Sequence, residues 1–228
     1  RTPRVRSGLV VKVNVGYAAG FNGALLKTPY GGTNWNYING PLGAMSSTGK
    51  IIYNLYFFDV NIGWAVGDAP NASSAFVYKT IDGGATWTAA SNIPILNNTL
   101  WGIDFVNPSI GYISGAAGKV MKTIDGGVTW TDVSLTTTNY TVVGGLATLP
   151  KAQTYGGLQV LDANTAVISS LNNGCVLRTT NSGATWYASG NQGFGIPQMA
   201  TWQMAATGPT KDTIVNAGGN RKSGGCGK

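Results

Sequence analysis

The chain has 228 residues, of which 43% are hydrophobic and only 10% charged, so it is typical of one globular domain with a substantial core and not of a disordered protein. It contains no His, and its eight acidic residues are all Asp, which excludes Ser-His-Asp and Cys-His catalysis and most zinc sites. The net charge of +7 is thinly spread, and no nucleic-acid-binding module accompanies it.

Successive units of the chain each predict four short β-strands in the same order. In the unit at residues 51–99, the strands are expected at 55–58, 63–66, 76–80 and 87–90, with turn residues between them. Similar units are expected at residues 8–50, 100–150 and 151–198, and a partial fifth unit at residues 199–228. We therefore expect a single all-β domain over residues 1–228.

The partial fifth unit has two expected strands, at 201–205 and 213–219, and ends before another Trp motif. Either the N-terminal segment completes this last blade, or further blades lie outside the sequence. We favour the second alternative, because this type of repeat usually closes with more units.

A turn motif recurs between the third and fourth expected strands of each full unit. It contains Lys or Arg, Thr, a Gly-rich turn and Trp, and it stands at residues 27–35, 79–87, 122–130 and 178–186. Its Trp residues are 52, 43 and 56 positions apart, which is typical of the blades of a β-propeller. We predict a propeller of four-stranded antiparallel blades, four complete and a fifth partial.

The chemistry of this motif predicts a stapled turn rather than an active site. An Asp can accept backbone N–H bonds within the turn, a Gly can adopt positive φ, and the Trp can pack beneath. The residues expected to build the turns are Thr80, Asp82, Gly84 and Trp87 in the second unit, Thr123, Asp125, Gly127 and Trp130 in the third, and Asn181, Gly183 and Trp186 in the fourth.

The pattern Thr-x-Asp-x-Gly-x-Thr-Trp at residues 80–87 and 123–130 resembles the Asp-box, or bacterial neuraminidase repeat. Together with the preceding Gly-aromatic-Ala-Val-Gly pattern at residues 63–67, it is similar to the propeller family typified by photosystem II stability/assembly factors. Sortilin-type receptors and xyloglucanase-type glycoside hydrolases share the box. The resemblance implies a non-enzymatic scaffold that binds other proteins. Tyr30 and Asn181 replace the Asp, and since only Asn can mimic the turn, we expect the first blade to be the loosest.

The alternative is a carbohydrate-active module, either a lectin-like binder or a fragment of a glycoside hydrolase. Asp82 and Asp125 could form a carboxylate pair, but their places in separate repeats assign them to turns. Asp59, Asp104 and Asp162 follow equivalent first strands, so they either cap their own turns or form a ring of carboxylates.

Aromatic residues and the two Cys residues allow further interpretations. Core packing between blades is favoured over sugar stacking for five aromatic residues: Tyr17, Trp64, Trp101, Tyr112 and Trp202. Cys175 and Cys226 lie at equivalent positions of adjacent units, so a disulfide between them is one hypothesis and two free thiols the other.

The remaining expectations concern partners and location. We expect no cofactor, no metal and no nucleic acid, but a protein partner or a surface polysaccharide, with side-by-side assembly as a further option. No apolar run reaches the ~20 residues that span a bilayer. The chain opens on Arg1, so we expect that a presequence has been removed or that the chain is a fragment. Its low charge and its many Asn, Thr, Ser and Gly residues favour a secreted, periplasmic or cell-surface protein.

Overall fold

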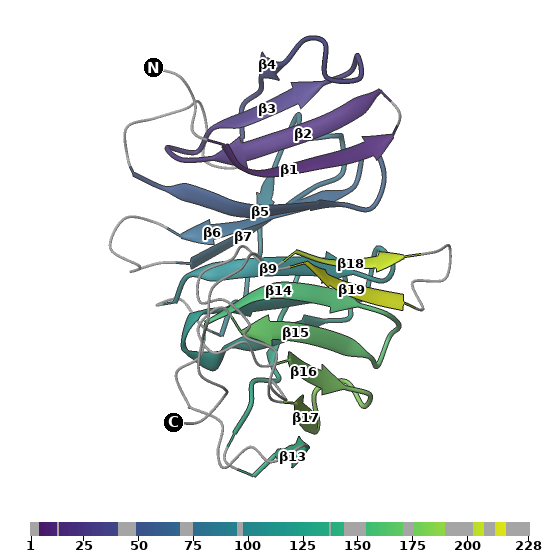
Figure 1. The fold of residues 1–228 in the computed structure, drawn as a ribbon. Coiled ribbons are helices and arrows are strands. Elements are labelled where there is room, and N and C mark those ends of the chain that lie inside the picture. The colour runs from purple at the N-terminus through teal and green to yellow at the C-terminus, as the bar shows by residue number, and fades with distance from the viewer. Residues whose placement is uncertain are drawn as a thin grey trace.

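The computed structural model describes residues 5–12, 14–40, 49–68, 75–94, 98–136, 138–143, 154–170, 176–189, 203–207 and 213–217. The described residues form β-sheets, which lie one after another in chain order (Figure 1). No described helix is long and apolar enough to cross a membrane.

Three sheets contain four antiparallel strands in sequence order, as the repeat predicts. The first holds β1 (Val5–Lys12), β2 (Val15–Gly20), β3 (Leu25–Thr28) and β4 (Asn36–Tyr37). The second holds β5 (Ile51–Phe57), β6 (Gly63–Asp68), β7 (Ala75–Thr80) and β8 (Thr88–Ala89). The third holds β9 (Leu100–Phe105), β10 (Gly111–Gly115), β11 (Val120–Thr123) and β12 (Thr131–Asp132).

The fourth sheet has an additional strand that the repeat does not predict. Its four expected strands are β14 (Tyr155–Val160), β15 (Ala166–Ser170), β16 (Val176–Thr179) and β17 (Trp186–Ser189). The fifth, β13 (Tyr140–Val143), comes from the connection after the third sheet and pairs with β17 in parallel. The antiparallel pattern of the blades is therefore broken at this one outer edge.

The partial fifth unit forms a two-stranded sheet, β18 (Gln203–Thr207) and β19 (Thr213–Ala217). The first strands of neighbouring sheets contact one another in the order β1, β5, β9, β14 and β18, so they form the inner side of the molecule. Figure 1 shows the first four sheets in this order, from purple to green, with the yellow pair drawn beside β9 and β14. The fold is all-β and of the propeller type, as the sequence predicts.

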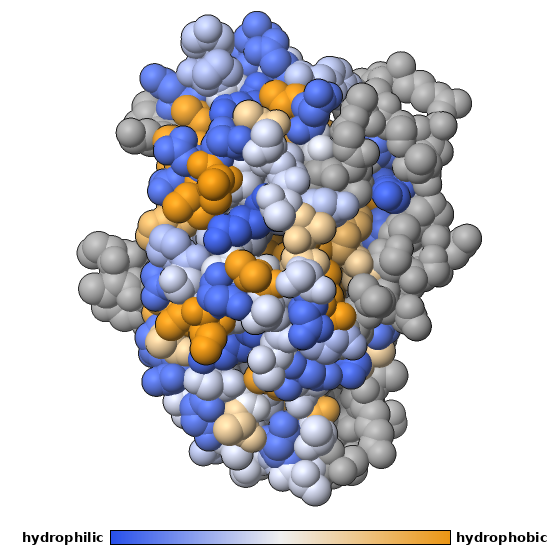
Figure 2. Space-filling view, turned by 180° about the vertical axis from the view of Figure 1, so that it is seen from behind, coloured by the Kyte–Doolittle hydropathy of each residue, from blue (hydrophilic) through white to orange (hydrophobic). Residues whose placement is uncertain are grey.

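Hydrophobic residues bury themselves between successive sheets rather than within one sheet. Tyr17 and Leu25 of the first sheet pack with Ile52 and Phe57 of the second. Equivalent clusters join the second sheet to the third and the third to the fourth. The space-filling view from behind shows hydrophobic residues as separate patches among hydrophilic ones, so the core lies inside and not on this face (Figure 2).

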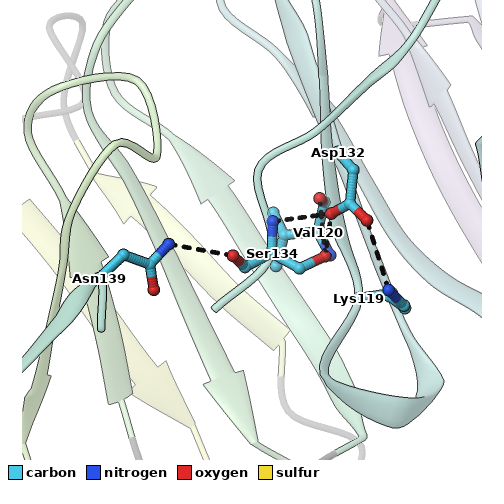
Figure 3. Close-up of polar contacts among 5 residues, drawn as sticks. All are labelled: Lys119, Val120, Asp132, Ser134 and Asn139. Carbon is cyan, nitrogen blue, oxygen red and sulfur yellow. Dashed lines mark hydrogen bonds and ion pairs between the residues drawn. The ribbon is translucent and has the colours of Figure 1, made fainter. Parts of the chain in front are cut away.

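Polar contacts fix the chain where it leaves the third sheet (Figure 3). Asp132, at the end of β12, forms an ion pair with Lys119 at 3.3 Å and accepts a bond from the Ser134 backbone N–H at 2.9 Å. The Ser134 hydroxyl accepts a bond from the Val120 N–H at 2.9 Å, and the Asn139 amide donates to the Ser134 carbonyl at 3.1 Å. These contacts direct the connection toward β13.

Candidate functional site

The box turn of the second sheet is built by one carboxylate and one hydroxyl. Asp82 Oδ1 accepts bonds from the Thr80 hydroxyl at 2.8 Å and the Thr86 N–H at 2.8 Å, while Oδ2 accepts from the Thr86 hydroxyl at 2.6 Å. The Thr80 hydroxyl also accepts a bond from the Gly84 N–H at 2.9 Å. Gly84 has φ of 87°, a conformation that residues with a Cβ rarely adopt.

The box turn of the third sheet repeats this geometry. Asp125 accepts bonds from the hydroxyls of Thr123 at 2.8 Å and Thr129 at 2.6 Å, and from the Thr129 N–H at 3.0 Å. Partial burial raises the pKa of the Asp125 carboxyl, but these hydrogen bonds outweigh that effect and lower the pKa to about 2. The Thr86 hydroxyl and N–H, followed by Thr80, likewise lower the pKa of Asp82 to about 2.

The fourth box keeps the turn with an amide in place of the carboxylate. Asn181 Oδ1 accepts a bond from the Thr185 N–H at 2.9 Å, and its amide donates to the Thr185 hydroxyl at 2.8 Å. In the first box, Tyr30 stands where the Asp would, and its side chain is 63% exposed. The Thr28 hydroxyl still accepts a bond from the Gly32 N–H at 3.0 Å, so the hydroxyl half of the turn remains.

The Trp residues lie beneath these turns. The indole N–H of Trp87 donates to Gly84 O, and that of Trp130 donates to Gly127 O, both at 3.2 Å. Trp186 differs, because its indole donates to Val133 O of the third sheet at 3.0 Å. Trp130 and Trp186 are fully buried, whereas Trp35 of the first box is 39% exposed.

The box turns of the second, third and fourth sheets are also held by the preceding sheet. The Tyr17 hydroxyl of the first sheet donates to Gly83 O of the second at 2.9 Å, and Lys27 Nζ donates to the same carbonyl oxygen at 2.9 Å. One sheet later, the Trp64 indole donates to Gly126 O at 3.0 Å. Lys79 Nζ lies 5.4 Å from the Trp64 ring, as Lys27 lies 5.2 Å from Tyr17.

The joint between the third and fourth sheets is a variant of this arrangement. Lys122 Nζ lies 5.4 Å from the Tyr112 ring and donates to the Ser182 hydroxyl at 2.7 Å and to Ala163 O at 2.8 Å. Ser182 replaces the first Gly of the turn and has φ of 64°. Burial lowers the pKa of Lys122, and the nearby Asp162 opposes this shift. The aromatic residue and Lys of one sheet and the turn of the next thus form a repeated inter-blade joint.

The structure shows which of the two predicted roles, turn cap or member of a carboxylate ring, each acid after a first strand has. Asp59 and Asp162 each accept backbone N–H bonds two and three residues ahead, so each caps its own turn. Asp104 is not equivalent to them, because it lies inside β9 and Asn107 caps the corresponding turn. The placement of Asp104 at an equivalent strand end is therefore wrong.

Asp104 instead connects two inner strands. It is 6% exposed, and its Oδ2 accepts bonds from the Gln159 amide at 2.8 Å and the Val160 N–H at 2.6 Å, both on β14. Burial, followed by the charge of Asp104, raises the pKa of Tyr56. This buried contact was not evident from the sequence, because nothing in the repeat distinguishes Asp104 from a turn residue.

Most of the aromatic residues considered for sugar stacking lie in the core. Tyr17, Trp64 and Tyr112 are 0% exposed. Trp101 is partly buried, and its ring centroid lies 4.3 Å from that of Tyr53. The side chain of Trp202 lies outside the described residues.

Tyr53 and Trp101 stand at β-bulges, where the register of strand pairing shifts by one residue. The pairing skips Tyr53 between β5 and β6, and Trp101 between β9 and β10. The first strands of the other two full sheets skip a residue at the corresponding place, so the bulge recurs in every full blade. A bulge changes the direction of a side chain, and here it brings two aromatic rings of adjacent inner strands together.

Both residues of the hypothetical disulfide, Cys175 and Cys226, lie outside the described residues. Among the described residues, no group of three His, Cys, Asp or Glu side chains is arranged to hold a metal ion. The predicted site residues that the structure does describe lie in three separate turns, one each in the second, third and fourth sheets.

The comparison with protein families identifies this repeat. The model of the family "Photosynthesis system II assembly factor YCF48" matches residues 44–209. The chain belongs to this family. No match was found among curated proteins.

Solved structures of the YCF48 family and of glycoside hydrolases have similar folds. YCF48 from Cyanidioschyzon merolae is 14% identical, with a TM-score of 0.56, over 94% of this chain and 71% of that one. The GH74 enzyme of Niastella koreensis is 19% identical, with a TM-score of 0.58, over 78% of this chain and 28% of that one. A YCF48 bound to a D1 peptide is 13% identical, with a TM-score of 0.48, over 81% and 80% of the two chains.

Proposed function

We propose that the chain is a non-enzymatic propeller scaffold that holds another protein on its surface. Membership of a family of assembly factors supports a role in protein binding. The repeated inter-blade joints support it as well, because they give a rigid frame from which loops can present a binding surface.

The observation that carries the proposal is that the described carboxylates are engaged in hydrogen bonds within the protein. Asp59, Asp82, Asp125 and Asp162 accept hydrogen bonds within their own turns, and Asp132 accepts one from Ser134. The other two described acids, Asp68 and Asp104, are buried and accept bonds from Thr99 and from β14. The seven described Asp side chains thus have structural roles, and a hydrolase without His or Glu would need free carboxylates.

A carbohydrate-active role is the alternative function, and the paired rings of Tyr53 and Trp101 are the feature that favours it. Rings inclined at 44° with centroids 4.3 Å apart cover part of each other's face, so they offer less flat surface for a sugar than an isolated ring would. Protein binding therefore remains the better-supported proposal.

The test combines capture of a partner with an assay for hydrolysis. The native protein should retain one protein from its source under native conditions, cross-links should map to one propeller face, and the purified pair should bind again. Turnover of xyloglucan or sialosides that is lost in Asp104→Asn but kept in Asp162→Asn would overturn the proposal. Binding of a glycan alone, without a protein partner, would favour the alternative.

We also propose a secreted, periplasmic or cell-surface location. The low share of charged residues, 10%, supports it. Fractionation of the source cells tests it, and recovery of the protein only from the cytosol would contradict it.

A further inference from the structure

Two turns lie side by side at one end of the second sheet, and two more at the same end of the third. In each sheet, one turn joins the first and second strands, and the other is the box turn. A backbone hydrogen bond links them, from Gly83 N–H to Asn61 O and from Gly126 N–H to Ser109 O, both at 2.8 Å. We call these turns, at residues 58–62, 81–86, 106–110 and 124–129, the box face.

The box face carries exposed hydrophobic side chains. Among the described residues of the second and third sheets, four large hydrophobic side chains are exposed, and all of them stand on this face: Phe58, Ile81, Ile124 and Val128, at 43%, 69%, 72% and 53%. The turn itself does not require them, because the fourth box forms with Thr180 in the place of Ile81 and Ile124. Exposed apolar side chains that gather on one face mark an interaction surface.

The turns of two sheets adjoin on this surface. The Ser91 N–H, just after β8 of the second sheet, donates to Val128 O of the third box at 3.3 Å, and the Ser91 hydroxyl donates to the same oxygen at 3.1 Å. Asn92 and Thr129 also form a β-bridge. The box face is therefore a surface that spans two blades.

The charged side chains of the box face are all carboxylates: Asp59, Asp82 and Asp125. Asp82 and Asp125 are exposed, and they form no ion pair among the described residues. Their hydrogen bonds lower the pKa of each to about 2, so both are ionised at neutral pH. The box face is thus apolar and negatively charged.

The Lys side chains near these turns are held in the joints between sheets. Lys27 Nζ donates to a carbonyl oxygen of the second box at 2.9 Å, and Lys79 Nζ lies 5.4 Å from the Trp64 ring. At the opposite end of the third sheet, the exposed acid Asp132 forms an ion pair with Lys119 at 3.3 Å. The two ends of this sheet therefore differ, because only the box face presents carboxylates without a paired cation.

We propose that the box face holds the partner of the scaffold, and that the partner docks through a segment rich in Lys or Arg and in large aliphatic residues. The aliphatic side chains of such a segment cover the exposed hydrophobic residues, while its cations approach Asp82 and Asp125. An acidic segment would be repelled by the same carboxylates. This inference rests on the proposed protein-binding function.

Three short synthetic peptides test the proposal against the whole chain. The first alternates Lys with Leu, the second has Glu in place of Lys, and the third has Gly in place of Leu. The Lys-Leu peptide should bind best, and each of the others about 10-fold more weakly or less, by fluorescence anisotropy. The net charge of +7 favours the Glu-Leu peptide, so a preference for Lys-Leu reports the local charge of the docking surface.

Variants of the third sheet locate the site. Asp125→Asn and Ile124→Thr should each weaken binding of the Lys-Leu peptide about fivefold or more. Both variants should fold, because Asn181 and Thr180 stand at these places in the fourth box and its turn forms. Asp132→Asn is the matched control, since it removes an exposed carboxylate at the opposite end of the same sheet, and it should bind like the wild type.

Several outcomes would overturn the proposal: no binding of the Lys-Leu peptide, equal binding of the three peptides, a preference for the Glu-Leu peptide, or an effect of Asp132→Asn as large as that of Asp125→Asn. The proposed function fails separately, because it depends on a partner captured from the source. A captured partner that both Asp125→Asn and Ile124→Thr still retain at full strength would leave the scaffold function in place and overturn docking on the box face.

Discussion

Thr123 shows how much of a box turn depends on a single hydroxyl. This side chain, in a residue 1% exposed, donates to Asp125 at 2.8 Å and accepts from the buried Gly127 N–H at 2.9 Å. The Asp125 carboxylate then accepts hydrogen bonds from the outer half of the turn. The hydroxyl and the carboxylate thus satisfy backbone groups that the turn would otherwise leave unpaired.

Thr123→Val should lower the free energy of unfolding by about 1–3 kcal/mol, because it keeps the shape of the side chain but leaves the Gly127 N–H unpaired. Urea denaturation measures the effect. Thr180→Val is the control, since Thr180 is exposed in the fourth box where Ile81 and Ile124 stand in the second and third. Equal losses in the two variants would contradict this role of the buried hydroxyl.

The box carboxylates should make stability sensitive to acid. The pKa values of Asp82 and Asp125 fall from 3.8 to about 2 on folding, so their contribution is complete above about pH 4 and is lost as the pH falls through about 2. The double variant Asp82→Asn, Asp125→Asn should keep the turns, as Asn181 does in the fourth box, and melt with a flatter pH dependence. Thermal melts between these pH values test this prediction. If the melting temperature of the double variant depended on pH as steeply as that of the wild type, the prediction would be contradicted.

At the scale of elements, the inter-blade joint predicts a graded response at Trp64. Trp64→Phe keeps the stacking on Phe105, whose ring centroid is 3.7 Å away, but loses the bond to Gly126 O, so it should cost about 1 kcal/mol. Trp64→Ala also opens a cavity and should cost about 3–5 kcal/mol. Chemical denaturation distinguishes the two, and similar losses in both would show that the hydrogen bond outweighs the packing.

The strands were predictable to the extent that they follow the repeat. The order of four strands and the position of every box follow from periodic Gly, Thr and Trp residues, and the structure shows strands at each predicted place. The expected strand at 55–58 is observed at Ile51–Phe57, since its first half includes the bulge at Tyr53 and does not alternate regularly. β13 has no counterpart in the other units, so no repeat could reveal it.

The candidate site was less predictable than the strands. The residues of each box are adjacent in sequence, so their contacts could be inferred locally. Asp104 and Gln159 are 55 positions apart and meet only because β9 and β14 are neighbours. The same holds for Tyr53 and Trp101, whose pairing depends on two bulges.

For the whole molecule, stability should vary along the series of sheets, because each sheet packs mainly on its neighbours. Three equivalent amides test this: Ile38 donates to Leu25 O, Ala90 to Val77 O and Val133 to Val120 O, at 2.9–3.0 Å. Hydrogen exchange should be faster at Ile38, in the sheet whose box Trp, Trp35, is 39% exposed, than at Val133, in the sheet whose Trp130 is 2% exposed. Equal protection would show that the described sheets open as one unit.

The inter-blade joint also has a direction. In all three joints, the aromatic residue and the Lys belong to the earlier sheet and the turn to the later one. During synthesis, the aromatic residue and the Lys of each joint therefore leave the ribosome before the turn that they contact. The nascent chain can add one blade at a time, each onto a finished surface, without waiting for the C-terminus.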